Sequence, residues 1–175
     1  MDMKHVKYLA LALCIGNLSP VMAQTASKSL TVDNLVAWQR ISGQAISDNG
    51  KWMACKMEPW EGDAVVSLYD AQGKELATFP QAGRFLFSAS SDYLVVSQKP
   101  GKMIMDSLKI KKTKKEKMPM DALVIYSLAG NREVIDSLRT FKLAEKMDWL
   151  AFQKGRKDST LYVRPLNGKL STRYE

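Results

Sequence analysis

The chain has 175 residues, and its 26 Lys and Arg outnumber its 18 Asp and Glu, for a formal net charge of +8. Its single histidine is His5, so residues 24–175 contain no imidazole. These residues therefore cannot supply a Ser-His-Asp or Cys-His catalytic site, or a zinc site with a histidine ligand. We expect no cofactor and no metal ion in this protein.

Residues 1–23 have the pattern of a secretory signal peptide. Two lysines precede the apolar stretch YLALALCIGNL, which is too short to cross a bilayer as a mature helix. Cleavage after Ala23 would give a periplasmic or extracellular protein without a stable membrane anchor. Lipidation of Cys14 is the alternative, although a leucine stands where a lipoprotein signal has a small residue. Cys55 alone remains after cleavage, so no internal disulfide is expected, and its apolar neighbours favour a small buried side chain.

Residues 24–44 are predicted to form a polar linker and then a short helix. The linker is QTASKS, and the stretch LTVDNLVAWQRISG follows it. Asp33 can cap the residues after it, while Leu35, Val36 and Trp38 crowd one side of a helical turn. Gly43 would end this helix just before the first strand.

Residues 45–175 alternate short strands with turns, which is typical of an all-β fold. The predicted strands fall into three cycles of four, with REVIDSL ending the second cycle and TFKLA beginning the third. A Lys-rich insertion at about residues 101–119 interrupts the second cycle. Within it, residues 102–117 hold seven Lys against Asp106 and Glu116. The basic charge is therefore a local feature, and no nucleic-acid partner is expected.

The three cycles repeat in register. When Trp52 is aligned with Tyr93 and Trp149, Ser47 coincides with Ser88 and Ala144, at intervals of 41 and 56 residues. The second interval is longer by 15 residues, about the length of the insertion. Both intervals are then close to ~40–45 residues, the period of a four-stranded propeller blade. The sequence predicts about three antiparallel blades, an incomplete β-propeller.

Each repeat carries a structural motif at the turn between its first two strands. The hydroxyl of the serine and the carboxylate of Asp48 are expected to bind backbone groups at the blade corner. The aromatic residue after the turn is expected to pack between neighbouring sheets, because a blade cannot bury both of its apolar faces alone. The motif residues are Ser47, Asp48, Gly50, Lys51, Trp52, Ser88, Tyr93 and Trp149.

The stretch LVAWQRISGQAISDNGKWMACKMEPWEGDAVVSLYD resembles the first blade of exported bacterial peptidases of the prolyl oligopeptidase family, relatives of dipeptidyl peptidase IV. The resemblance extends over roughly residues 30–170 and rests on Trp38, Ile41, Ile46, Ser47, Asp48, Gly50, Lys51, Trp52, Pro59, Gly62 and Asp63. It implies a propeller that controls the access of peptide substrates to a serine hydrolase domain. Only three blades are present here, whereas closure takes about 4–8, and no Gly-x-Ser-x-Gly segment occurs. No catalytic residue can therefore be carried over.

Three interpretations remain open at this stage. The chain could be the N-terminal propeller part of such a peptidase, non-catalytic by itself and prone to self-association through open blade edges. It could instead be a small exported binding protein that closes its array of sheets with other copies or with a partner. The Lys-rich insertion could also bind an anionic partner. Glu58, Glu61 and Asp63 are interpreted as a solvated acidic loop rather than a site for a substrate amine.

Overall fold

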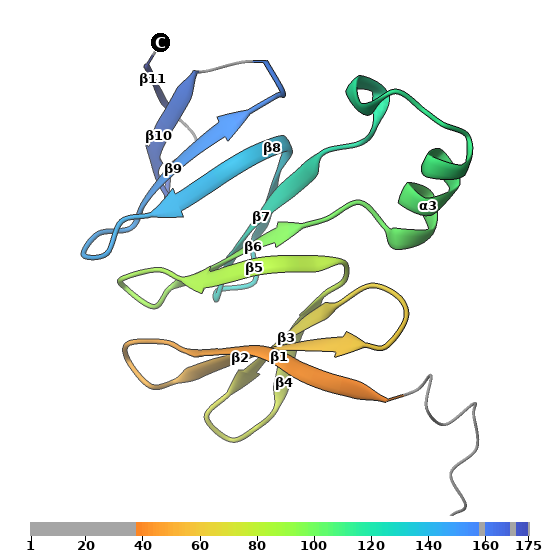
Figure 1. Cartoon of the computed structure of the whole chain (residues 1–175). Coiled ribbons are helices and arrows are strands. Elements are labelled where there is room, and N and C mark those ends of the chain that lie inside the picture. Colours follow the sequence, from red (N-terminus) through yellow and green to blue (C-terminus); the bar gives the residue numbers. More distant parts are fainter. Residues whose placement is uncertain (1–37, 158–159, 169–170, 175) are drawn as a thin grey trace, which may run out of the picture. The chain divides into compact units, whose positions relative to one another are not determined.

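The computed structural model of the chain describes residues 38–157, 160–168 and 171–174, so the predicted signal peptide and residues 24–37 lie outside the described part. The described residues are mostly strand, with one α-helix and one 3-10 turn (Figure 1). The elements are β1 Gln39–Ile46, β2 Trp52–Pro59, β3 Val65–Asp70, β4 Glu75–Phe79, β5 Ala82–Phe87, β6 Tyr93–Gln98, α3 Lys102–Ile110, η1 Lys115–Lys117, β7 Asp121–Ser127, β8 Arg132–Leu143, β9 Trp149–Lys154, β10 Leu161–Pro165 and β11 Thr172–Tyr174.

The first predicted blade is confirmed as a four-stranded antiparallel sheet in the order β1-β2-β3-β4, which we call blade 1. The predicted helix is wrong for its last residues, because β1 begins at Gln39 and pairs with β2 from Gln39–Pro59 to Ile46–Met53. A helix of one or two turns is only marginally stable by itself. The backbone partners that β2 offers therefore decide the conformation of this segment.

The second and third predicted blades share one seven-stranded sheet, in the order β11-β10-β9-β8-β7-β6-β5. The two strands predicted at REVIDSL and TFKLA are one strand, β8. Its first half pairs with β7 and its second half with β9, and the register shifts between Leu138 and Thr140. Ser137 has a φ of 60° next to this shift. We call β5–β7 with the first half of β8 blade 2, and the second half of β8 with β9–β11 blade 3.

The core lies between successive blades. Blade 1 presents Ala54, Val66 and Leu68 to Leu94 and Val96 of blade 2, and all five side chains are fully buried in one cluster. Since alternate residues of a strand point to opposite faces, the neighbouring residues of blade 2 pack the other way, in a second cluster with blade 3. Its members include Val95, Leu123, Ile125, Leu150 and Phe152. We call the face that each blade turns toward the next its leading face, and the opposite one its trailing face.

Candidate functional site

The first blade corner is built by Ser47 and Asn49. The Trp52 N–H donates to Ser47 Oγ at 3.0 Å, and Ser47 Oγ donates to Asn49 Oδ1 at 2.8 Å. The Lys51 N–H donates to the same Asn49 oxygen at 3.0 Å. Asp48 is exposed. The side-chain amide of Asn49 makes the contacts that had been expected of the Asp48 carboxylate. Gly50 has a φ of 69°, a left-handed conformation that glycine adopts without strain.

The second and third corners repeat this geometry. The Ser47 N–H donates to the Trp52 carbonyl at 2.9 Å, and the equivalent bonds from Ser88 to Tyr93 and from Ala144 to Trp149 are both 3.0 Å long. Ser88 Oγ also accepts the Tyr93 N–H at 3.2 Å. Ala144 has no hydroxyl, so the third corner keeps the backbone turn without the side-chain bond.

Hydrogen bonds also join each corner to the next. The Asn49 N–H donates to Ser91 Oγ at 3.2 Å, and the Ser90 N–H donates to Asp148 Oδ1 at 2.9 Å. Asn49 and Ser90 are equivalent positions, because they are separated by the repeat interval of 41 residues. The predicted motif missed Asn49, Ser91 and Asp148. The repeat register indicates that the donors Asn49 and Ser90 are equivalent, but the acceptors Ser91 and Asp148 are not at equivalent positions.

The two neighbours Ser47 and Asp48 should differ clearly in their effect on stability. Ser47 is buried, so the Ser47→Ala change leaves the Trp52 N–H without its side-chain acceptor and should cost about 1–2 kcal/mol of unfolding free energy. The Asp48→Ala change removes an exposed side chain and should cost less than about 0.5 kcal/mol. Urea unfolding followed by circular dichroism measures both. Equal losses would contradict the assignment of the corner bonds to Ser47 and Asn49.

The three aromatic positions differ in burial. Trp52 packs against the cluster between blades 1 and 2, and Tyr93 packs against the cluster between blades 2 and 3. Trp149 is 41% exposed on the leading face of blade 3. It lines a shallow pocket of about 450 Å³ together with Met147, Ala151 and Val163. The expectation that Trp149 packs between sheets is therefore wrong for the described chain, because no described blade covers this face.

The opposite end of the blades carries the loops after β2, β6 and β9. The Lys-rich insertion is the loop after β6, and part of it is the helix α3 rather than a plain loop (Figure 1). Asp63 of blade 1 holds its start, since Asp63 Oδ1 accepts the Lys102 N–H at 2.8 Å. This carboxylate lies at the helix N-terminus, where negative charge is favourable. Arg156 of blade 3 holds the end of the insertion, since Arg156 Nη2 donates to the Met118 carbonyl at 2.6 Å.

The acidic residues near the first of these loops do not act as one group. Glu58 pairs with Arg40 at 3.1 Å, and the hydrogen bond from Arg40 lowers the pKa of the Glu58 carboxyl. Asp63 is used by α3, and Glu61 is exposed. This arrangement fits the interpretation of a largely solvated loop, with a structural role for Asp63.

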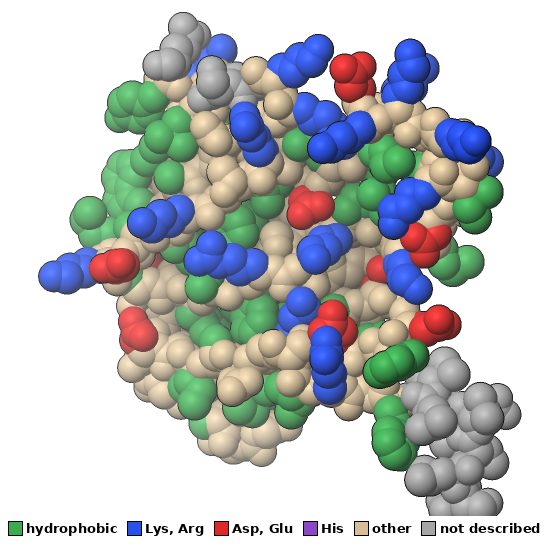
Figure 2. Space-filling model, in the orientation of Figure 1, with side chains coloured by type: hydrophobic (Ala, Val, Ile, Leu, Met, Phe, Trp, Pro, Cys, Tyr) green, Lys and Arg blue, Asp and Glu red, His purple; other side chains and the backbone are tan. Residues whose placement is uncertain are grey.

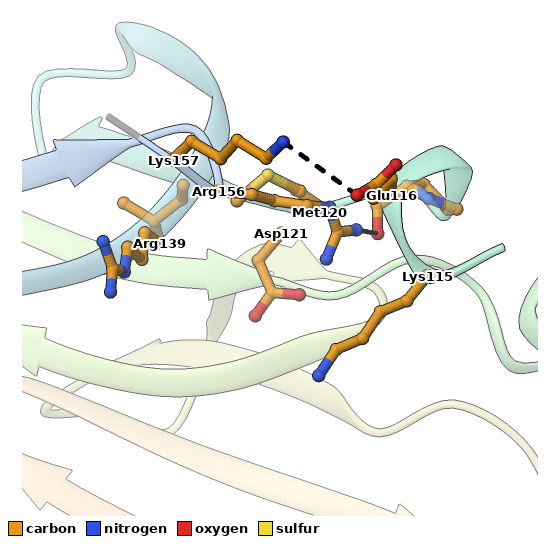
Figure 3. A pocket seen from close by; sticks show the side chains of 9 residues that line it. Lys115, Glu116, Met120, Asp121, Arg139, Arg156 and Lys157 are labelled. Carbon is orange, nitrogen blue, oxygen red and sulfur yellow. Dashed lines mark hydrogen bonds and ion pairs between the residues drawn. The ribbon is translucent and has the colours of Figure 1, made fainter. Parts of the chain in front are cut away.

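A basic pocket of about 620 Å³ lies between the insertion and blade 3 (Figure 3). Lys115 and Arg139 lie on either side of Asp121 in this view, and Lys157 faces Glu116 at 4.0 Å. The complete lining is Lys115, Glu116, Pro119, Met120, Asp121, Leu138, Arg139, Arg156 and Lys157. Cations outnumber carboxylates here, so the pocket suits an anionic group. Its lining holds no histidine, cysteine, serine or threonine that could act as a nucleophile or an imidazole base.

Burial raises the pKa of the Asp121 carboxyl, while the charge of Lys99 opposes that rise. The folded state therefore binds a proton more tightly than the unfolded state does. Stability contributed by this group is present at low pH and is lost as pH rises from 3.8, the ordinary value, through the raised pKa of the folded state.

The Asp121→Asn variant should consequently be more stable than the unchanged protein at neutral pH. The difference should disappear in acid, where both side chains are neutral. Thermal unfolding across a pH series measures this trend. The Asp48→Asn change at an exposed position is the matched control and should show little difference at any pH. A gain for Asp121→Asn that persists in acid would contradict the burial argument.

In the described part of the chain, no group of three or more His, Cys, Asp or Glu side chains is placed to hold a metal ion. Among the same residues no helix has the length and apolarity needed to span a membrane. Cys55 is a free thiol and is half-buried on the trailing face of blade 1, so it is less buried than the sequence suggested.

By sequence, the chain matches no family profile and no curated protein. Its structure is similar to part of a prolyl endopeptidase, with a TM-score of 0.53 and 13% identity over 77% of this chain and 22% of the other. It is also similar to a eukaryotic initiation factor, with a TM-score of 0.50 and 10% identity over 78% of this chain and 33% of the other. The chain thus spans a third or less of these structures.

At such low identity the likeness concerns the fold alone. Together with the strand order and the repeated corners, it defines this protein as an all-β chain with an incomplete propeller-like fold. One of its structural neighbours is a prolyl endopeptidase and another is an initiation factor of unrelated function, so the fold does not identify the activity.

Proposed function

We propose that the chain forms the first propeller blades of an exported serine peptidase of the prolyl oligopeptidase type. In such an enzyme the propeller would control the access of peptides to a hydrolase domain. The chain alone would be non-catalytic, because its only histidine is His5. The residues matched in blade 1 and the fold of a prolyl endopeptidase neighbour support this proposal.

The observation that carries the proposal is the exposed leading face of blade 3. Trp149 occupies the position at which Trp52 and Tyr93 pack against a following blade. Met147, Leu161 and Tyr174 are also exposed there, by 61%, 37% and 55%. Exposed apolar patches commonly mark contact surfaces. The equivalent faces of blades 1 and 2 are each covered by the following blade, so we infer that a further blade would cover this face.

A second candidate is a small exported protein that closes its array of sheets by association. The trailing face of blade 1 favours it, because Ile41, Ile46 and Met53 are exposed there by 65%, 69% and 37%. Two apolar faces at opposite ends of a stack of blades would allow copies to join head to tail.

Two measurements separate the candidates. The first is the reading frame downstream of the codon for Glu175, which the peptidase proposal expects to continue into further blades and a Gly-x-Ser-x-Gly segment. The second is sedimentation of the purified chain beside its Trp149→Glu and Ile46→Glu variants. A defined oligomer that either change dissociates would favour association, particularly if a stop codon follows Glu175.

Export is tested separately by mass spectrometry of the protein recovered from the producing cell. Cleavage of the signal peptide predicts an N-terminus at Gln24 and a location outside the cytoplasm. An intact residue 1 in a cytoplasmic fraction would contradict export without bearing on the fold.

A further inference from the structure

Helix α3 turns apolar side chains toward solvent. Met103 and Ile110 are 84% and 82% exposed, and Ile104 is 57% exposed. Met103 and Ile110 are seven residues apart, so they lie on one strip of the helix. Met105 and Leu108 are half-buried and occupy another side. Part of the apolar surface of the helix therefore remains exposed to solvent and is not buried against the rest of the protein.

Lysines without acid partners follow this helix in the chain. Among residues 38–157, 160–168 and 171–174, the ion pairs of the insertion are Lys109 with Asp106 at 3.2 Å and Glu116 with Lys157 at 4.0 Å. The lysines that follow α3 have no ion pair within these ranges, and they are Lys111, Lys112, Lys114, Lys115 and Lys117. Figure 2 shows several Lys and Arg side chains over the end of the molecule that bears α3, with others spread over the rest of this face.

An exposed tryptophan lies at the same end. Trp60 is 86% exposed in the loop after β2. Three residues later, Asp63 accepts the hydrogen bond that fixes the start of α3. Tryptophan is enriched where a protein meets the boundary between water and lipid, because its ring is apolar and its N–H is polar.

We propose that this end of the molecule docks reversibly on an anionic lipid bilayer. In this interaction α3 lies in the plane of the interface, with Met103, Ile104, Ile110 and Trp60 entering the boundary between headgroups and acyl chains. The lysines contact the headgroup phosphates, because the negative potential of an anionic membrane attracts basic side chains close to its surface. Asp63 and Arg156 hold the two ends of the insertion on the blades, so its orientation is fixed before it binds.

The exposed apolar side chains favour a membrane over an acidic polymer as the partner. A nucleic acid or an acidic polysaccharide would use the lysines but would leave Met103 and Ile110 in water. A bilayer uses both, as interfacial amphipathic helices do. A nine-residue helix gives weak binding, so this is a transient contact rather than an anchor, and it is independent of the proposed peptidase role.

The test measures binding of the full chain to vesicles of phosphatidylglycerol mixed with phosphatidylcholine, and to vesicles of phosphatidylcholine alone. Co-sedimentation should show binding to the anionic vesicles that decreases with salt. Tryptophan emission should shift to shorter wavelength, and the shift should be lost in Trp60→Phe but kept in Trp149→Phe. Any binding by residues 1–23 is common to all variants, so the comparison between variants cancels it.

Two sets of substitutions identify the surface. Met103→Ser with Ile110→Ser should weaken binding at least about tenfold, because it removes the apolar contribution. Serine at Lys111, Lys112, Lys114 and Lys115 should weaken it at least as much. Serine at Lys51, Lys74, Lys142 and Lys146, four exposed lysines outside the insertion, is the charge-matched control and should leave binding nearly unchanged.

The proposal is wrong if anionic vesicles do not bind. It is also wrong if the Met103 and Ile110 changes have no effect while the lysine changes abolish binding, since the surface would then serve a soluble or polymeric anion. Equal losses in the charge-matched control would show a general charge effect and would contradict it too. Circular dichroism of each variant confirms that the sheets are intact.

Discussion

The Leu150→Ala variant is expected to lose about 2–5 kcal/mol of unfolding free energy, the range for large-to-small changes in a core. Leu150 is fully buried in the cluster between blades 2 and 3. Its side chain lies on the trailing face of blade 3, with Leu143 directly opposite it on β8. The shortened side chain would leave a cavity between blades 2 and 3. The two blades cannot easily close it, because hydrogen bonds within their common sheet hold them in place. Since domains are stable by only about 5–15 kcal/mol, the transition midpoint in urea should fall substantially.

The neighbouring residue is the control for this prediction. Trp149 is larger than Leu150 but points to the leading face of blade 3 and is 41% exposed. The Trp149→Ala change should therefore cost less than about 1 kcal/mol, as most exposed substitutions do. This ranking reverses what side-chain size alone predicts. If Trp149→Ala is as damaging as Leu150→Ala in the isolated chain, something covers the leading face, and sedimentation would show whether that partner is another copy.

The repeat made the fold predictable from the sequence. Short alternating runs between turn residues identified most of the strands, and the alignment of Trp52 with Tyr93 and Trp149 identified the blades. The Lys-rich insertion was recognised because it lengthened one repeat interval. These features are local, since a turn and an alternating strand are largely determined by residues close together in the chain.

The features that the sequence did not predict depend on distant partners. The pairing of β1 with β2 converts a helix-like pattern into a strand. Along β8 the pairing changes from β7 in the first half to β9 in the second half. This arrangement depends on two neighbouring strands that lie on opposite sides of β8. The exposure of Trp149 depends on whether a following blade exists. The bond from Ser90 to Asp148 spans 58 residues and could be indicated only by combining the repeat with a propeller geometry.

The Glu133→Gln variant is expected to lose about 2 kcal/mol, the range of a hydrogen bond to a charged group. Arg164 of β10 donates to Glu133 of β8 at 2.7 Å, and the Arg164 side chain is only 4% exposed. Within the described residues, Arg164 Nε has no hydrogen-bond partner. Glu133 is therefore the charged group that compensates the buried guanidinium. The full effect reported for deeply buried pairs, about 3–5 kcal/mol, is not expected, because Glu133 is 38% exposed.

The Glu58→Gln change provides a matched control, because Glu58 also pairs with an arginine. Arg40 and Glu58 are 3.1 Å apart, and Glu58 is 36% exposed, close to the value for Glu133, whereas Arg40 is 78% exposed. The same substitution at Glu58 should thus change the unfolding free energy much less than Glu133→Gln does, because exposed ion pairs contribute little to stability. The comparison isolates the burial of the arginine, measured by urea unfolding at neutral pH.

A double variant separates the value of the pair from the cost of breaking it. Glu133→Gln combined with Arg164→Met removes both charges and should recover much of the stability that Glu133→Gln loses, because no buried cation remains unpaired. Additive losses in the double variant would mean that Arg164 stabilises the sheet through its apolar stem rather than through its charge. Glu133 lies in the first half of β8, which belongs to blade 2, and Arg164 lies in β10 of blade 3, so this pair reports directly on how the two blades are held together.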